Sequence, residues 1–508
     1  MPRSALPLLT ASLVAVLPVL IAAKPAPPPD VTVGSSFVNP VESLGGLNPA
    51  FGFSTTHGDF NGDGWEDVVI GDQQADFAVV DDVYGAVSVY PGSAAGFGAE
   101  PTQIFFGREV WEYFGAEVAC AGDVNGDGYD DVLISGYLTR DASFLGRSAL
   151  YLGSSSGLVE AAAAEFDGSF PNAYLKAVSL GDVNADGYAD VMVSMSADGT
   201  NPARQDLYLG EPSGLPATPS MSFNAGSGLV VSSFGVGDLN GDGYADVIIT
   251  DYEWSNYVGR GLVYEGGPDG LHSSGVTITG DGEFLGFGGR ISGGSDVNGD
   301  GYDDVLAAAI GDASLKGAVY LYAGSGSGLV SSPVLTLVGE FQEAYFGMST
   351  SMIGDVNGDG YADFAVHSNG VDREAAQLKR GVVQVYEGGA VWPSAPGFVL
   401  VGTQDYTDYG SPTGGGGDVD NDGDDDMLVS RVAEQQVDLV LGWSESPEDS
   451  GDSGDSGDRL DTGDDRAGAD PQGCGCTSTP AVYSPGWLMV AAAFAYRRRT
   501  QTAGARPL

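Results

Sequence analysis

A nine-residue pattern that occurs seven times constrains the fold of this chain more than any other feature. Each copy reads D-x-[N/D]-x-D-G-x-x-D, and the copies begin at Asp59, Asp123, Asp182, Asp238, Asp296, Asp355 and Asp418. Successive copies start 64, 59, 56, 58, 59 and 63 residues apart. This regular spacing leaves no room for an inserted domain and indicates a repeat architecture.

Each unit shows the same order of short strand-like runs separated by glycine turns. One run leads into the loop, a second follows it (132–134), a third ends in a glycine turn (85–92), and a fourth leads to the next unit (333–338). β-branched and aromatic residues at this spacing indicate strands. Four strands in each of seven units predict an all-β fold, a seven-bladed β-propeller of four-stranded blades over residues 31–443.

The two ends of the repeat region predict how the ring closes. After the seventh loop only two strand-like runs remain, 428–430 and 437–441, so the last blade lacks its outer strand. The run 31–37 precedes the first unit and has no blade of its own. We therefore predict that this N-terminal strand completes the last blade.

The repeated loop has the ligand pattern of a calcium site. Oxygen-bearing side chains alternate along it, and glycine stands where the chain bends, as a hard cation requires. An EF-hand is excluded because position 12 is Ile70, Ile134 or Ile249 inside a strand, where an EF-hand needs Glu. Asp-Asn-Gly runs also form simple turns, but seven copies with Asp at positions 1, 5 and 9 favour calcium.

We expect up to seven structural Ca²⁺ ions, one per blade, held by side chains at positions 1, 3, 5 and 9 and by the backbone carbonyl at position 7. No other cofactor is expected. The candidate ligands are Asp59, Asn61, Asp63, Trp65, Asp67, Asp123, Asn125, Asp127, Tyr129, Asp131, Asp182, Asn184, Asp186, Tyr188, Asp190, Asp238, Asn240, Asp242, Tyr244, Asp246, Asp296, Asn298, Asp300, Tyr302, Asp304, Asp355, Asn357, Asp359, Tyr361, Asp363, Asp418, Asp420, Asp422, Asp424 and Asp426.

The charge of the chain agrees with this interpretation. The formal net charge is −50, which argues against nucleic acid as a partner, because nucleic-acid binders carry basic patches. Three Asp residues in each of seven loops supply 21 of the carboxylates. The repeats contain only Cys120, so no disulfide joins one repeat to another.

The flanking segments predict secretion and attachment at the outer cell surface. Residues 1–23 have the pattern of a secretory signal peptide, with an uncleaved membrane anchor as the alternative. A Pro-rich spacer follows (24–30). The acidic Ser-Gly-Asp run 444–473 predicts a disordered linker. Residues 474–499 combine two cysteines, an apolar segment and an Arg cluster, which indicates an anchoring or processing signal, although a buried helix is an alternative.

The units resemble FG-GAP repeats, the blades of the integrin alpha-subunit N-terminal propeller. The residues that carry the resemblance are Phe51-Gly52, Phe114-Gly115, Phe287-Gly288, Phe346-Gly347, the variant Tyr409-Gly410, and the Gly-Ala pairs Gly85-Ala86 and Gly317-Ala318. Units three and four depart, with Ala173-Tyr174 and Leu229-Val230 at this place. The resemblance implies calcium in some of the loops and a role in adhesion. The tail is similar to myxobacterial C-terminal sorting signals.

The expected function is therefore a calcium-binding, cell-surface module for adhesion or protein interaction. Its partner is expected to be a surface protein or a glycan, and the sequence leaves the oligomeric state open. Alternatives are a polysaccharide-binding or polysaccharide-degrading propeller, lectin or lyase, and a structural surface-layer component. We do not expect an enzyme, because the three histidines are scattered and the G-x-S-x-G match at 153–157 falls at a glycine turn of the repeat.

Overall fold

The computed structural model describes residues 33–38, 50–75, 84–109, 112–136, 146–168, 175–197, 201–224, 231–280, 282, 284–311, 315–369, 380–402, 409–410 and 413–443. The predicted signal peptide, spacer, acidic linker and C-terminal tail lie outside these residues. Within the described part of the chain, no helix has the length and apolar character needed to cross a membrane.

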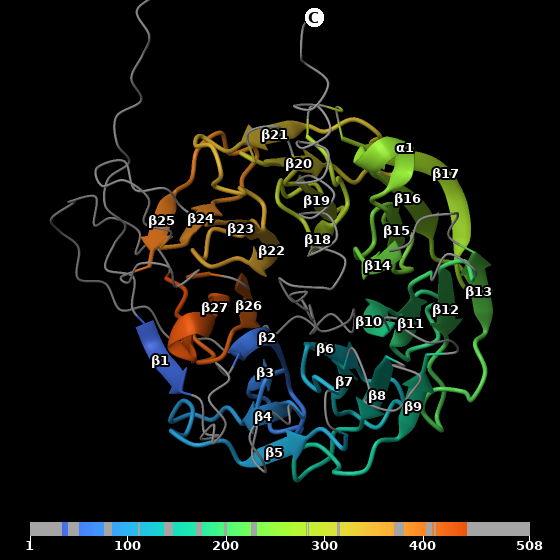
Figure 1. Cartoon of the computed structure of the whole chain (residues 1–508), viewed down its shortest axis with the longest axis vertical. Coiled ribbons are helices and arrows are strands. Elements are labelled where there is room, and N and C mark those ends of the chain that lie inside the picture. The colour runs from blue at the N-terminus through green and yellow to red at the C-terminus, as the bar shows by residue number, and fades with distance from the viewer. Residues whose placement is uncertain are drawn as a thin grey trace, which may run out of the picture.

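Seven four-stranded antiparallel sheets are arranged around a ring, one per repeat (Figure 1). Each of the first six blades uses four strands that follow one another in the chain, from the centre outward. Blades 1 to 3 are formed in order by β2 (Phe51–Gly58), β3 (Asp67–Asp72), β4 (Ala86–Tyr90) and β5 (Gln103–Phe106); β6 (Glu117–Gly122), β7 (Asp131–Gly136), β8 (Arg147–Tyr151) and β9 (Ala164–Asp167); and β10 (Leu175–Gly181), β11 (Asp190–Met195), β12 (Arg204–Tyr208) and β13 (Met221–Asn224). Blades 4 to 6 are formed by β14 (Val231–Gly235), β15 (Val247–Asp251), β16 (Arg260–Glu265) and β17 (His272–Thr279); β18 (Arg290–Ser295), β19 (Asp304–Ala309), β20 (Ala318–Tyr322) and β21 (Leu335–Val338); and β22 (Ser349–Gly354), β23 (Asp363–Ser368), β24 (Val382–Tyr386) and β25 (Phe398–Val401). The described helices are α1 (Trp254–Tyr257) and the 3₁₀ turn η1 (Val432–Glu434).

The seventh blade joins the two ends of the repeat region. It contains β26 (Thr413–Gly417), β27 (Asp426–Arg431), β28 (Gln436–Val440) and, as its outer strand, β1 (Val33–Val38). β1 pairs antiparallel with β28 and places Ser36 opposite Asp438. The predicted seven-bladed fold and its closure by the N-terminal strand are therefore both confirmed.

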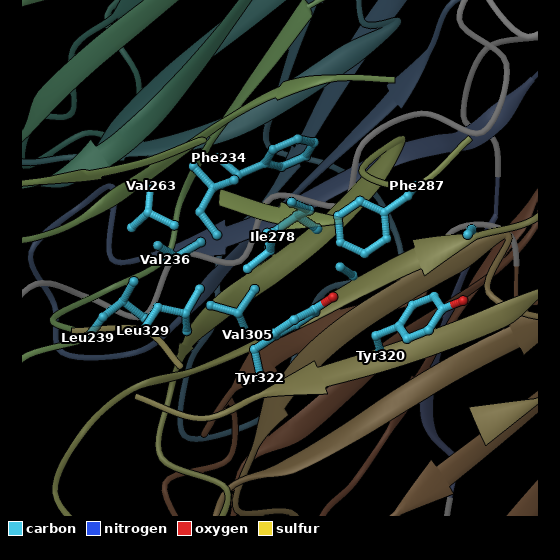
Figure 2. Packing of buried hydrophobic residues seen from close by; sticks show 14 of the residues in the cluster. Phe234, Val236, Leu239, Val263, Ile278, Phe287, Val305, Tyr320, Tyr322 and Leu329 are labelled. Atoms are coloured by element: carbon cyan, nitrogen blue, oxygen red, sulfur yellow. The ribbon is translucent and has the colours of Figure 1, made fainter. Parts of the chain in front are cut away.

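The hydrophobic core lies between neighbouring blades and not within any one blade. Figure 2 shows the cluster between blades 4 and 5, where Phe234 and Ile278 face Phe287, Tyr320 and Tyr322. The Phe287 ring lies edge-on to both tyrosines, with ring centroids 5.7 and 6.2 Å apart. Such contacts stabilise aromatic pairs beyond their area burial.

The aromatic residue of each described Phe-Gly or Tyr-Gly pair fills such an interface. Phe51, Phe114, Phe346 and Tyr409 are all buried in inter-blade clusters. The glycine allows a close approach, since a methyl group at Gly115 would lie 2.6 Å from the backbone oxygen of Ala86. The departing pairs of units three and four lie outside the described residues.

Candidate metal centres

Each repeated loop connects the innermost strand of a blade to the second strand, as β6 and β7 are connected through 123–130. Since every blade enters through its innermost strand in the same direction, the seven loops lie on one face of the ring. The five candidate ligand positions of each blade therefore belong to one loop.

The first Asp of each loop organises the backbone around it. In the second loop, Oδ1 of Asp123 accepts the N–H of Asp127 at 3.1 Å, and its Oδ2 accepts the N–H of Gly128 at 2.7 Å. The same two hydrogen bonds occur in all seven loops. A third organising contact comes from Asn125, whose Oδ1 also accepts the Asp127 N–H, at 2.9 Å. Oδ1 of Asp123 also accepts the N–H of Gly126 at 2.6 Å, so it is Oδ2, with a single donor, that keeps acceptor capacity for a cation.

Two loop positions have positive φ, and their values explain the residues found there. At position 4, φ is 54–74°, in the left-handed region that Ala185 and Asn421 also enter. At position 6, φ is 85–102°, and all seven copies have glycine. This conformation strains any residue that carries a Cβ.

The Asp at position 9 is buried and clamps two parts of its blade. Oδ1 of Asp131 accepts the N–H of Gly153, at the end of the third strand, at 2.8 Å. Its Oδ2 accepts the N–H of Val124 within the loop at 3.1 Å. The glycine contact occurs in all seven blades at 2.7–3.1 Å. The sequence predicted this Asp as a ligand, but its hydrogen bond to the glycine was not predicted. The available sign was that a glycine ends the third strand of every unit.

The environment of the position-9 carboxyls opposes their ionisation. Burial raises the pKa of Asp131 to about 7, against the backbone N–H bonds that lower it, and the nearby Asp123 and Asp127 raise it further. For the same reasons the pKa is about 8 for Asp190 and Asp363, and about 7 for Asp67, Asp246, Asp304 and Asp426. A bound divalent cation supplies the positive charge that these clustered carboxylates need.

The seventh loop gathers the most carboxylate. Oxygen atoms of Asp418, Asp420 and Asp426 all lie within 4.8 Å of one another. Among the described residues, no other group of acidic, His or Cys side chains is as compact. The cause is Asp420, which stands where the other six loops have Asn.

Neighbouring loops are linked into a chain around the face. The backbone N–H at position 8 donates to the position-1 carbonyl of the preceding loop at 2.9–3.2 Å, at the six junctions Asp130–Asp59, Ala189–Asp123, Ala245–Asp182, Asp303–Asp238, Ala362–Asp296 and Asp425–Asp355. The position-7 ring also covers the preceding loop. A methyl group at Gly62 would lie 2.6 Å from the Tyr129 ring. These loop-to-loop contacts were not predicted from the sequence.

The junction between blades 7 and 1 is built from side chains. Nδ2 of Asn421 in the seventh loop donates to the Gly64 carbonyl in the first loop at 3.3 Å. Within blade 1, Nδ1 of His57 lies 3.0 Å from Oε2 of Glu66, and both side chains lie against Gly417 of blade 7. Burial opposes protonation of His57, but the hydrogen bond and charge of Glu66 outweigh it, so the pKa of His57 is raised. We call this junction the seam.

Comparison with known proteins agrees with the repeat structure. A family model described as an FG-GAP-like repeat matches residues 59–134, 123–193, 182–249 and 296–366. Integrin alpha-5 of Xenopus laevis is 30% identical over 243 residues, covering 44% of this chain and 21% of the relative. Integrin alpha-8 of Gallus gallus is 30% identical over 235 residues, covering 43% and 21%. This chain thus spans about a fifth of the length of these relatives.

Among solved structures, Sqt1 of Saccharomyces cerevisiae aligns with a TM-score of 0.42 at 11% identity, covering 80% of this chain and 97% of that one. A likeness at this level adds nothing to the assignment. The matched repeats, by contrast, cover slightly more than half of the chain. The chain belongs to the family of FG-GAP-like repeat proteins.

Proposed function

We propose that this chain is a secreted, surface-tethered β-propeller that binds calcium structurally and serves as an adhesion or protein-interaction module. The observation that carries the proposal is the set of seven loops with the same oxygen-bearing side chains and the same backbone hydrogen bonds. The relatives named as integrin alpha subunits support the adhesion role. The flanking segments 1–23 and 474–499 support secretion and tethering.

Calcium would stabilise the ring through the residues that hold each loop. The Asp at position 1 holds the loop backbone, and the Asp at position 9 joins the start of the second strand to the end of the third. An ion bound by both would therefore hold the loop, the second strand and the third strand together. Each site occupied at a calcium concentration about 100 times its Kd adds about 2.7 kcal/mol to the free energy of unfolding. Several occupied sites therefore make a large contribution to stability.

The test of calcium binding is thermal unfolding of the full chain in calcium, in a calcium chelator, and in magnesium. We expect chelation to lower the Tm by at least 10 °C, calcium to restore it, and magnesium to restore it poorly, because Mg²⁺ requires a stricter octahedral geometry. Asp127→Asn should reduce the calcium effect. Asp269→Asn, at an exposed turn outside the loops, is the matched control. A Tm that does not respond to chelation would remove calcium from the proposal.

The adhesion role is tested separately, by capturing surface proteins with the immobilised chain in calcium. We expect capture to depend on calcium and to be lost in chelator. The three histidines lie in blades 1, 4 and 6, which favours a binding module over an enzyme. A captured partner that binds equally well with calcium and with chelator would show that adhesion does not depend on calcium in the repeated loops.

Glycan binding is the second candidate, and a cavity between blades 2 and 3 favours it. The cavity has a volume of about 390 Å³, within the usual range for small-ligand sites. Phe166 and Tyr208 form an aromatic wall with ring centroids 4.9 Å apart. At the rim, Arg204 and Asp206 form an ion pair at 2.6 Å and offer donors and acceptors. A glycan array and a lyase assay test this candidate, and catalytic turnover would overturn the adhesion proposal.

A further inference from the structure

The outer rim of blades 5 and 6 carries most of the exposed large hydrophobic side chains in the described part of the chain. Nine large hydrophobic side chains are exposed in the described part of the chain, and six of them belong to these two adjacent blades. They are Val330, Val334, Val338, Val391, Val399 and Val401. Grouped exposed apolar side chains mark interaction sites more often than scattered ones do.

The same rim is free of charge. Residues 321–339 and 388–402 contain no Asp, Glu, Lys or Arg, in a chain whose net charge is −50. The outer strands β13 and β17 of blades 3 and 4 are also uncharged, whereas β9 of blade 2 exposes Glu165 and Asp167, so the exposed valines are what set this rim apart. We call the valines named above, together with strands β21 and β25, the uncharged rim.

Both strands of the uncharged rim also present a free backbone edge. β21 is hydrogen-bonded to β20 and β25 to β24, and on the other side neither has a hydrogen-bonded neighbour among the described residues. In β21, Leu335 and Leu337 pack against the cluster between blades 5 and 6, whereas Val338 is 51% exposed. An edge strand is usually protected by charge, proline or cover, and the charges are missing here.

We propose that the uncharged rim is a self-association surface that binds the same rim of a second copy of this chain. Two copies of a chain with a net charge of −50 repel each other wherever acidic surfaces meet. The uncharged rim lets them meet without placing like charges in contact. A two-fold contact would bring the same strands of both copies together, and both would gain edge pairing and valine burial.

The small size of the uncharged rim predicts weak association, and its lack of charge predicts how the association depends on salt. Each strand has four residues, so few backbone bonds can form and the contact should be weak. Added salt should strengthen it, because screening reduces the repulsion between the two acidic molecules and removes no attractive ion pair. A contact held by ion pairs would show the opposite response.

The test is sedimentation of the full chain over a range of concentrations, in low and high salt, with calcium and with chelator. We expect a concentration-dependent dimer that strengthens with salt. The double variant Val338→Lys with Val401→Lys should weaken association by at least about tenfold, because it buries like charges at the contact. Thr218→Lys with Thr277→Lys adds the same charges at exposed positions of blades 3 and 4 and is the matched control.

The outcomes separate the possible occupants of the rim. The proposal holds if the rim variant becomes monomeric while the control still dimerises and both keep the parent's Tm. It is overturned if the parent is monomeric at every concentration, or if both variants associate as the parent does. Retained binding of the rim variant to a captured surface protein would show that adhesion uses another surface. The result does not depend on calcium, so failure here leaves the proposed calcium function untouched.

Discussion

The seam and the other six junctions join blades in different ways. At six junctions a backbone N–H at position 8 of one loop donates to the backbone carbonyl at position 1 of the loop before it. At the seam, the Asn421 side chain of blade 7 donates to the Gly64 carbonyl of blade 1, and the His57–Glu66 pair of blade 1 lies against Gly417 of blade 7. The chain runs through the six ordinary junctions, but at the seam it must bring residues more than 350 positions apart together.

Strand pairing at the periphery of blade 7 adds to the hydrophobic cluster that joins blades 7 and 1 at the seam. β1 pairs with β28 through five registered residue pairs on the outer side of blade 7. The ordinary junctions instead have continuous loop contacts near the centre. The predictions below test this division, beginning with the largest expected effect.

Deleting Val33–Val38 removes the outer strand of blade 7 and should open the seam. The loss of about five backbone hydrogen bonds at about 1 kcal/mol each lowers the free energy of unfolding by on the order of 5 kcal/mol. Denaturant unfolding measures this change. Deleting six residues within the spacer 24–30 is the control, and an equal effect of the two deletions would show that β1 does not carry the closure.

Acid should weaken the junction between blades 6 and 7 through His367. Burial lowers the pKa of His367 to about 3, from an ordinary value of 6.5, so the unfolded chain takes up the proton first. The stabilising effect is complete above pH 6.5 and is lost as the pH falls toward 3. At pH 4.5 the loss is on the order of 3 kcal/mol relative to neutral pH.

His367→Leu removes the group that takes up this proton. The free energy of unfolding of the variant should therefore fall less than that of the parent between pH 6.5 and 4.5. The measurement is the difference in free energy of unfolding between parent and variant at several pH values, which cancels the contribution of the carboxylates. A difference that does not change with pH would show that the ring of His367 titrates normally in the folded chain.

Asp130→Ala should weaken one ordinary junction while leaving the seam intact. The Asp130 carboxylate accepts the N–H of Asp59 in the preceding loop at 3.0 Å. Removing it leaves this donor without that acceptor and should cost about 1–2 kcal/mol, measured by denaturant unfolding in calcium. Asp130→Asn keeps an acceptor oxygen and should cost less. Equal losses in the two variants would contradict a role for the hydrogen bond.

Much of the architecture could be predicted because its signals are local. The loop pattern and the strand runs of each unit lie within about 60 residues. The strand before the first unit has no blade of its own, and the last blade lacks an outer strand, so their pairing could be predicted. In the seventh loop Asp418, Asp420 and Asp426 come together as a compact carboxylate group, and the ligand sets of the other loops stay predictions. The partners that complete the site could not be predicted, because they are backbone groups. Gly153 contacts Asp131 through its N–H, and Asp59 is bonded by the Asp130 carboxylate 71 positions away.

The sequence by itself determined the number of blades, the position of the loops and their oxygen-bearing side chains, since these follow from residue types at fixed spacings. The tertiary structure decided which of these groups are buried, how one loop is bonded to the next, and which valines are exposed on the outer rim. Burial and loop-to-loop bonding arise only when blades pack side by side. The Asp123 loop illustrates both, because its residues were evident in the sequence and its link to Ala189 of the next blade appears only in the closed ring.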